Sequence, residues 1–274
     1  MNASEPLAQF WDPTTSSVDW CEDNYSVSPY VVEFYNTLSS LAMIFFGEYG
    51  ARQPLVKENT QFQWVFRLIS VVGVGSTLFH ATLKHSTQMM DELPMVWLVS
   101  FCLNHLLKSM YNLHHPALSW GMFLVTLVSS VIVFLTSGLV QFFTFHVIYN
   151  IYQFTCVGLV VILYRQRRNR FPKAAQLVHR GLMFLILAGV FWLMDTYFCH
   201  WVNGKIQSIL PVNMQLHAWW HFFVSLGFYY LCAFLLFDEQ IRLHRQPFVK
   251  YHWLILPEIV LQPVSSTQPR RKVQ

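Results

Sequence analysis

Apolar residues form long runs along almost the whole chain, and polar residues gather between these runs. Each run holds about 20 residues, the length that a helix needs to cross the hydrocarbon core of a membrane. Helices and closed barrels alone satisfy their backbone hydrogen bonds there. The pattern therefore predicts an all-α integral membrane bundle of seven transmembrane helices, at residues 31–47, 64–83, 91–108, 119–137, 142–164, 181–198 and 215–237.

The composition supports this class of protein. Of the 274 residues, 54% are hydrophobic and only 12% are charged, whereas soluble domains carry about 25% charged residues. Because the apolar runs leave no room for a second domain, we expect residues 1–274 to form one unit. Residues 1–30 should lie outside the membrane, and residues 261–274, rich in Pro, Ser, Thr and basic side chains, should form a flexible tail.

The basic residues predict the orientation of the bundle. With seven spans, all of the 18 Lys and Arg residues except Lys84 and Lys205 fall on the side of the C-terminus or flank it. Basic residues are retained on the cytoplasmic side, so the N-terminus should be lumenal and the C-terminus cytoplasmic. This distribution accounts for the net charge of +4 without a nucleic-acid partner, and the sequence implies no obligatory protein partner.

Two cysteines map to the same side of the predicted membrane. Cys21 precedes the first span and Cys199 ends the sixth, so both face an oxidising compartment,. We predict that they pair, and two free thiols are the alternative because the sequence does not contain the geometry of the pair. Cys102, Cys156 and Cys232 fall within spans and should act as small apolar side chains,.

A pair of histidines opens the last predicted span. His217 and His221 are four residues apart, so their rings leave one face of a helix, as two adjacent metal ligands do,. Trp219 and Trp220 lie between them, and an aromatic belt at the membrane interface is the competing interpretation.

Further polar residues fall at the same depth of the membrane. Ser76 and His80 lie near the end of the second span, and Asp91 opens the third. By the predicted orientation they share the lumenal half of the bilayer with His217 and His221. Three neutral imidazoles leave a tetrahedral zinc ion one open position for water, which is the arrangement of a hydrolytic site. Convergence of these residues favours a catalytic metal.

Other polar residues have simpler interpretations. The alternative for Ser76 is a bond to its own helix backbone, the alternative for Asp91 is a cap of the third span, and Glu92 should face lipid headgroups. A structural hydrogen bond is the favoured role for Asp195, and support of a metal ligand is the alternative. Six histidines lack a paired spacing with the cluster and are expected to be interfacial or structural: His85, His105, His114, His115, His146 and His200.

The N-terminal segment is acidic. Asp19, Glu22 and Asn24, followed by Glu33, gather hard oxygen ligands as a calcium site does, although the spacing is not that of an EF-hand,. A solvated acidic turn is the alternative. Asn24 and Asn2 also begin formal glycosylation sequons, and at Asn24 glycosylation and metal ligation would exclude each other,.

With these motifs in view, the chain closely resembles the alkaline ceramidases, particularly their phytoceramidase-type branch. These belong to a wider group of seven-span hydrolases that share Ser-x-x-x-His, Asp and His-x-x-x-His. The resemblance covers nearly the whole chain, and its most specific stretches are 11–25, 33–37, 75–83, 90–95 and 215–221.

The resemblance implies roles for individual residues. It makes His80, His217 and His221 zinc ligands, with Ser76 and Asp91 beside the activated water. It implies a calcium site, a Cys21–Cys199 disulfide and a ceramide-type substrate, which is cleaved to a sphingoid base and a fatty acid. Asp91 would move the proton of the water to the departing amine, and Ser76 would stabilise the oxyanion. The implied calcium ligands are Asp19, Trp20 through its carbonyl group, Glu22, Asn24 and Glu33.

Two other functions remain open at this point. A seven-helix lipid-sensing receptor would use zinc structurally, but it would need neither Ser76 nor Asp91, and a structural zinc normally takes a fourth protein ligand. A hydrolase of another membrane lipid, such as a glycerolipid ester, would keep the same site. Arg271 and Lys272 near the C-terminus resemble a retrieval signal, so we expect residence in the endoplasmic reticulum or Golgi membrane,.

Overall fold

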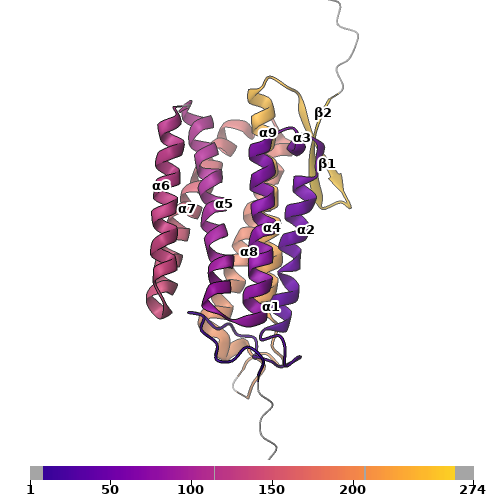
Figure 1. Ribbon diagram of the computed structural model, residues 1–274. Helices are drawn as coiled ribbons and strands as arrows, with labels where there is room; N and C mark the ends of the chain where they lie inside the picture. The colour runs from indigo at the N-terminus through magenta and orange to yellow at the C-terminus, as the bar shows by residue number, and fades with distance from the viewer. Residues whose placement is uncertain (1–8, 114, 207, 263–274) are drawn as a thin grey trace, which may run out of the picture.

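The fold is a bundle of long helices with a small β-hairpin at one end (Figure 1). The computed structural model describes residues 9–113, 115–206 and 208–262. Within these ranges, six helices are long and apolar enough to cross a membrane, and each overlaps one of the last six predicted spans. They are α4 (Thr60–Thr82), α5 (His85–Tyr111), α6 (Pro116–Leu135), α7 (Gly138–Arg167), α8 (Pro172–Val202) and α9 (Leu216–Arg242).

The first predicted span is divided. Helix α1 (Phe34–Ser39) and helix α2 (Leu41–Ala51) follow one another in line and are separated by Ser40 (Figure 1). The Ser40 hydroxyl donates to the carbonyl of Asn36 and bonds the hydroxyl of Ser76 at 2.9 Å. Neither helix is long enough alone to cross the hydrocarbon core, so the expected count of seven depends on α1 and α2 acting together. The short helix α3 (Pro54–Lys57) follows them.

Local sequence signals set several helix ends. The side chain of Asn59 accepts from the amides of Gln61 and Phe62 and so caps the start of α4,. Pro116 and Pro172 occupy first positions of α6 and α8, where the missing N–H costs nothing,. Leu83 caps the C-terminus of α4, and its left-handed φ of 44° turns the chain towards α5.

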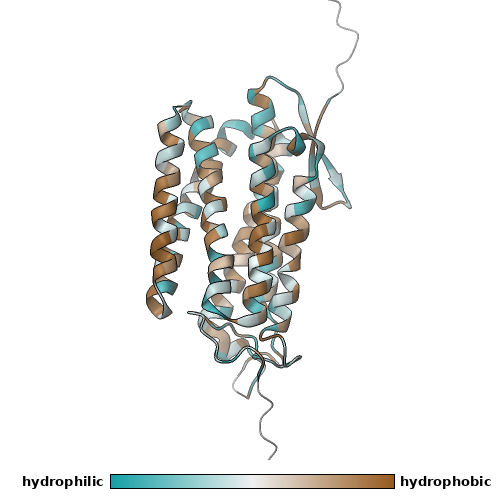
Figure 2. Ribbon diagram, viewed as in Figure 1, coloured by the Kyte–Doolittle hydropathy of each residue, from teal (hydrophilic) through white to brown (hydrophobic). Residues whose placement is uncertain are grey.

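Close packing joins the helices that carry the site. Helix α9 is the most buried of the long helices, and α6 lies at the periphery of the bundle (Figure 1). Gly75 on α4 faces α5 so closely that a Cβ there would lie 1.9 Å from the carbonyl oxygen of Met90. Any larger residue at 75 would push α4 away from the turn that holds Asp91. Hydrophobic residues predominate along the middle of the long helices, while hydrophilic residues are frequent towards their ends (Figure 2).

A β-hairpin follows α9 and was not predicted. Strand β1 (Pro247–His252) pairs antiparallel with β2 (Leu256–Leu261), with Pro247 opposite Leu261. The hairpin is held by the bundle, because the Tyr229 hydroxyl and the Gln53 amide both donate to the carbonyl of Pro257, at 2.8 and 3.1 Å.

The hairpin corrects two expectations. The fold is mainly helical and not purely α, and Leu261 belongs to a strand and not to the tail. The strands were missed because their six-residue pattern is short and their partners, Gln53 and Tyr229, lie far away in the sequence. Residues 263–274, with Arg271 and Lys272, lie outside the described residues, as do Asn2 and His114.

Candidate metal centre and cavity

Three histidines meet at the end of the bundle that carries the N-terminal segment. His80 belongs to the last turn of α4, and His217 and His221 belong to the first turns of α9. All three are buried, at 0%, 2% and 0% exposure. One nitrogen of each ring lies within 4.8 Å of the others, and among the described residues no other group of His, Cys, Asp and Glu side chains meets this criterion. The two predicted motifs are therefore together.

Neighbouring side chains orient two of the rings. Nδ1 of His80 lies 2.5 Å from Oε2 of Glu33, and this hydrogen bond fixes the orientation of the ring,. Nδ1 of His221 lies 2.8 Å from the Ser39 hydroxyl. Contacts of this kind to the far nitrogen are typical of metal-binding histidines. Neither Glu33 nor Ser39 was predicted to contact the histidines.

The rings fit a metal ion. Nε2 of His80 and Nδ1 of His217 are buried and have no hydrogen-bond partner within the described part of the chain. Leaving a buried polar atom unpaired costs free energy, about 1–3 kcal/mol, so two such atoms beside a third imidazole indicate a missing ligand. Three imidazole nitrogens match the preferences of zinc.

Ser76 lies beside this cluster. Its hydroxyl is 3.2 Å from Nε2 of His221 and 2.9 Å from the hydroxyl of Ser40, and its side chain is fully buried. It therefore bonds groups on α9 and between α1 and α2, and not its own helix backbone.

Asp91 lies in the second turn of α5, whose N-cap is Lys84, so Asp91 is not the cap of this helix. Its side chain is 7% exposed and lines the same cavity as His217.

Glu92 differs from its prediction. It was expected to face headgroups, but it is 6% exposed. Gln88 donates to its Oε1 at 2.8 Å, and Gln141 of α7 donates to Oε2. Gln88 also accepts from the backbone amide of Ser17 at 2.7 Å. The expectation failed because these partners come from α7 and from the N-terminal segment, which no local pattern connects to α5.

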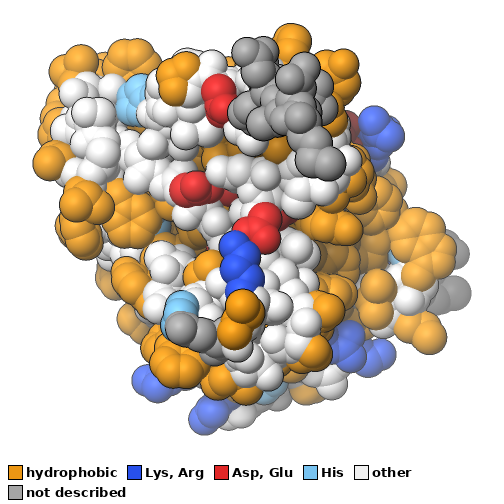
Figure 3. Space-filling model, turned by 90° about the horizontal axis from the view of Figure 1, so that it is seen from below, with side chains coloured by type: hydrophobic (Ala, Val, Ile, Leu, Met, Phe, Trp, Pro, Cys, Tyr) orange, Lys and Arg blue, Asp and Glu red, His pale blue; other side chains and the backbone are white. Residues whose placement is uncertain are grey.

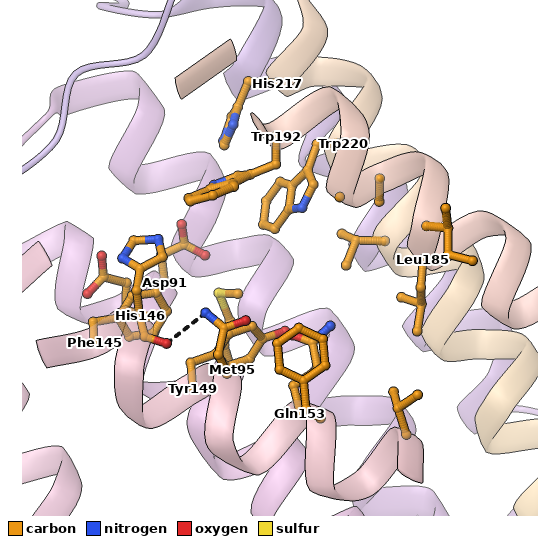
Figure 4. Close-up of a pocket in the computed structure, with 18 of the residues that line it drawn as sticks. Asp91, Met95, Phe145, His146, Tyr149, Gln153, Leu185, Trp192, His217 and Trp220 are labelled. Atoms are coloured by element: carbon orange, nitrogen blue, oxygen red, sulfur yellow. Dashed lines mark hydrogen bonds between the residues drawn. The ribbon is translucent and has the colours of Figure 1, made fainter. Parts of the chain in front are cut away.

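A mainly apolar cavity of about 330 Å³ opens beside the histidines, between α5, α7, α8 and α9 (Figure 4). His217 and Asp91 line it together with apolar side chains that include Met95, Leu185, Trp220 and Val224. Phe154 on α7 and Ile186 on α8 also line it and are each 68% exposed. The cavity therefore reaches the outer surface of the bundle between α7 and α8.

Asp195 ties the N-terminal segment to α9. Its carboxylate accepts from the backbone amide of Cys21 at 3.0 Å and from that of His217 at 3.2 Å. Asp195 thus forms the predicted structural hydrogen bonds, and one of them also supports the candidate ligand His217. Trp20 adds a second contact, because its indole stacks on the His217 ring at 3.7 Å between centroids. These contacts hold His217 in place, one from α8 and the other from the N-terminal segment.

The disulfide between Cys21 and Cys199 is present and excludes two free thiols. It joins the N-terminal segment to the end of α8, next to the Asp195 contacts. Cys102, Cys156 and Cys232 are free and buried, as expected.

The acidic residues lie in the N-terminal segment on the same end of the molecule, where Figure 3 shows acidic side chains near the middle of the face. Asn24 donates to both carboxylate oxygens of Asp19 at 3.3 Å, and Glu33 accepts from the amide of Trp20 at 3.1 Å. Glu22 accepts from the amides at the start of α1.

The acidic segment is partly buried, because Glu22 and Glu33 are buried while Asp19 is exposed. Burial raises the pKa of the Asp19 carboxyl, and it raises the pKa of Glu22 to about 7 against the effect of its backbone hydrogen bonds. The amide oxygen of Asn24 is buried without a hydrogen-bond partner among the described residues. The segment thus gathers hard oxygen donors, of which Glu22 and Glu33 are buried and Asp19 is exposed, and such a set fits a calcium ion,.

One histidine that was expected to be interfacial or structural lies in the cavity. His146 on α7 lines it beside Asp91 (Figure 4). His146 is not at a ligand-like spacing from another candidate residue, so the sequence did not place it in the site. Its neighbours in the cavity come from α5 and α8.

Comparison with known proteins identifies the family of the chain. The family model described as Ceramidase matches residues 12–260. Alkaline ceramidase 3 of Mus musculus is 31% identical over 265 residues, which cover 93% of this chain and 95% of the relative. The alkaline ceramidase of Arabidopsis thaliana is 31% identical over 94% of this chain and 98% of its own length. That of Drosophila melanogaster is 29% identical, with 89% and 86% covered. The chain belongs to the ceramidase family.

Proposed function

We propose that this chain is a zinc-dependent hydrolase that cleaves the amide bond of ceramide, phytoceramide or dihydroceramide. Three buried imidazoles with two unpaired nitrogens, at the end of an apolar cavity that Asp91 also lines, carry the proposal. The alkaline ceramidases of three organisms named above support the substrate class. The expected products are a free fatty acid and a sphingoid base.

His80, His217 and His221 would hold the zinc ion. Bound zinc supplies Lewis acidity, which lowers the pKa of water and polarises a carbonyl group. Glu33 and Ser39 keep the rings of His80 and His221 turned towards the site through their Nδ1 atoms. Trp20 covers the face of His217 and excludes water from that side.

Asp91 and Ser76 would perform the proton transfer and the charge stabilisation. As water attacks the amide carbon, the Asp91 carboxylate takes a proton from it, and a bond forms between the water oxygen and that carbon. The same proton then passes from Asp91 to the amine nitrogen as the carbon–nitrogen bond breaks. The Ser76 hydroxyl, 3.2 Å from His221, donates to the oxygen that becomes negative,.

The cavity suits a lipid that enters from the membrane. Its apolar lining fits hydrocarbon chains, and the exposed Phe154 and Ile186 line a sideways opening between α7 and α8. Helices α1 and α2 together span residues 34–51, about 27 Å at the rise of an α-helix, which would complete seven spans. The basic residues then favour a lumenal N-terminus, in the endoplasmic reticulum or Golgi membrane.

Calcium would bind the N-terminal segment through Asp19, the carbonyl of Trp20, Glu22, Asn24 and Glu33. Its role would be to order the segment that carries Trp20 and Cys21. Trp20 stacks on His217, and the amide of Cys21 donates to Asp195. Asp19→Asn should make activity require more added calcium after chelation. Asp23→Asn is the matched control, because the exposed Asp23 pairs with Lys205 instead. Equal calcium requirements of the two variants would contradict this role.

A substrate panel tests the reaction class. Purified protein in mixed micelles should release fatty acid from ceramide and leave a glycerolipid ester of the same acyl chain intact. Asp91→Asn should abolish this release while it keeps bound metal, because Asp91 moves a proton and is not a ligand. Faster cleavage of the ester would overturn the amide hydrolase and favour a glycerolipid substrate.

A further inference from the structure

The α7 wall of the cavity carries polar side chains that the proposed reaction does not use. His146, Asn150 and Gln153 all line the cavity, at positions that share one face of α7,. His146 lies beside Asp91, and Gln153 lies further along the cavity from His217 (Figure 4). Polar groups in a mainly apolar pocket usually fix the orientation of a ligand, so the atoms that these residues offer indicate the group they would bind.

His146 offers a hydrogen-bond acceptor. Its Nδ1 lies 2.7 Å from the backbone oxygen of Phe142, and because a carbonyl oxygen only accepts, Nδ1 carries the proton,. Nε2 of the neutral ring is then an acceptor, and no side chain or backbone group of the described ranges bonds it. The ring is held between Phe142, at 4.1 Å between centroids, and Trp192 of α8, at 5.1 Å. The acceptor is therefore held in place before a ligand binds.

Asn150 offers a second acceptor one turn away. Its Nδ2 donates to the backbone oxygen of His146 at 2.7 Å (the dashed line in Figure 4), which fixes the orientation of the amide group. Oδ1 is left without a partner in the part of the chain that the structure describes. Two fixed acceptors without donors favour a ligand that brings hydroxyl groups.

We infer that His146 and Asn150 form a subsite that binds a hydroxyl group of the sphingoid part of the substrate. The inference rests on the proposed function. A ceramide carries its two hydroxyls on the carbons that flank the one bearing the amide nitrogen. A substrate whose amide reaches Asp91 therefore brings a hydroxyl close to His146, and the hydrogen bond selects hydroxylated lipids without taking part in the proton transfers.

Matched substrates test the subsite. The measurement compares kcat/KM for ceramide, for the analogue that lacks the primary hydroxyl and for the analogue that lacks the secondary hydroxyl. The parent should prefer ceramide over one analogue by about tenfold or more, as sites built to bond a hydroxyl do. His146→Phe keeps the aromatic packing and should bring the ratio of kcat/KM for ceramide to kcat/KM for that analogue close to one. Asn150→Leu should lower it, and His146→Gln, which keeps an acceptor, should retain part of it.

Thr155→Val is the control, because Thr155 is exposed on α7 and its hydroxyl bonds only the carbonyl of Ile151; this variant should keep the parental ratio. Equal preference of the parent for all three substrates would overturn the subsite, and so would an unchanged ratio in His146→Phe. If His146→Phe does not fold, an unchanged ratio in Asn150→Leu overturns it. A parent that does not hydrolyse ceramide refutes the proposed function, and the subsite with it.

Discussion

Glu33 Oε2 lies 2.5 Å from Nδ1 of His80, so one buried carboxylate connects the acidic N-terminal segment to the metal centre. The other oxygen of Glu33 accepts from the amide of Trp20, whose indole stacks on His217. Two of the three histidines are thus supported by the same segment, and this segment is fastened by Asp195 and by the disulfide.

Replacing Glu33 should weaken zinc binding without removing a zinc ligand. Glu33→Gln replaces the carboxyl group that contacts His80 Nδ1 by an amide, and loss of such a contact lowers metal affinity by about 10–100-fold,. Competition with a zinc chelator measures the change. Glu48→Gln is the control, since Glu48 forms an exposed pair with Arg52. Parental zinc affinity in Glu33→Gln would show that His80 needs no carboxylate partner.

Ser76 and Asp91 should affect turnover and not zinc content. Ser76→Ala removes the proposed oxyanion donor, and losses of one such donor are about 10²–10³ in kcat. Asp91→Asn should cost about 10²–10⁴, the contribution of a general acid or base. Both variants should bind zinc like the parent. A Ser76→Ala protein with parental kcat would assign Ser76 to packing against Ser40.

Loss of the disulfide should destabilise the N-terminal segment. The double variant Cys21→Ser, Cys199→Ser should have a free energy of unfolding lower by about 2–4 kcal/mol, because the bond closes a long loop. Thermal unfolding in detergent measures this. Reductant should lower the Tm of the parent and leave the double variant unchanged. Equal sensitivity of both proteins to reductant would contradict the prediction.

The hairpin should depend on one tyrosine. Tyr229 donates to the carbonyl of Pro257 and accepts from Gln53, so Tyr229→Phe should lower the free energy of unfolding by about 1–3 kcal/mol,. Tyr197→Phe, at an exposed tyrosine, should have no such effect. Hydrogen exchange in residues 247–261 should be faster in Tyr229→Phe than in the parent, and it should be unchanged in Tyr197→Phe. If exchange of these residues is also unchanged in Tyr229→Phe, the strands are stable without this contact to the bundle.

The long helices were predictable because a membrane imposes a simple rule. Every backbone group in it must be bonded within the segment, so runs of about 20 apolar residues identify α4 to α9 whatever surrounds them. The histidines were predictable for a related reason: spacing of four places His217 and His221 on one face, and the alternation of direction brings the end of α4 to the same side.

Features that depend on distant partners were not predictable. The division at Ser40 accompanies a contact with Ser76 on α4, and the burial of Glu92 depends on Gln141 on α7. The roles of Glu33 and His146 likewise follow from neighbours on other helices. A polar residue in an apolar run has no assigned partner in the sequence, so only the folded chain distinguishes a headgroup contact from a buried network.

Metal content together with turnover tests the central claim most directly. Purified parent protein should contain one zinc per chain and release fatty acid from ceramide, lose that activity with the metal on chelation, and regain it with added zinc. His217→Ala should neither retain zinc nor hydrolyse ceramide. If His217→Ala bound zinc and hydrolysed ceramide like the parent, the three-histidine site would not be the catalytic centre.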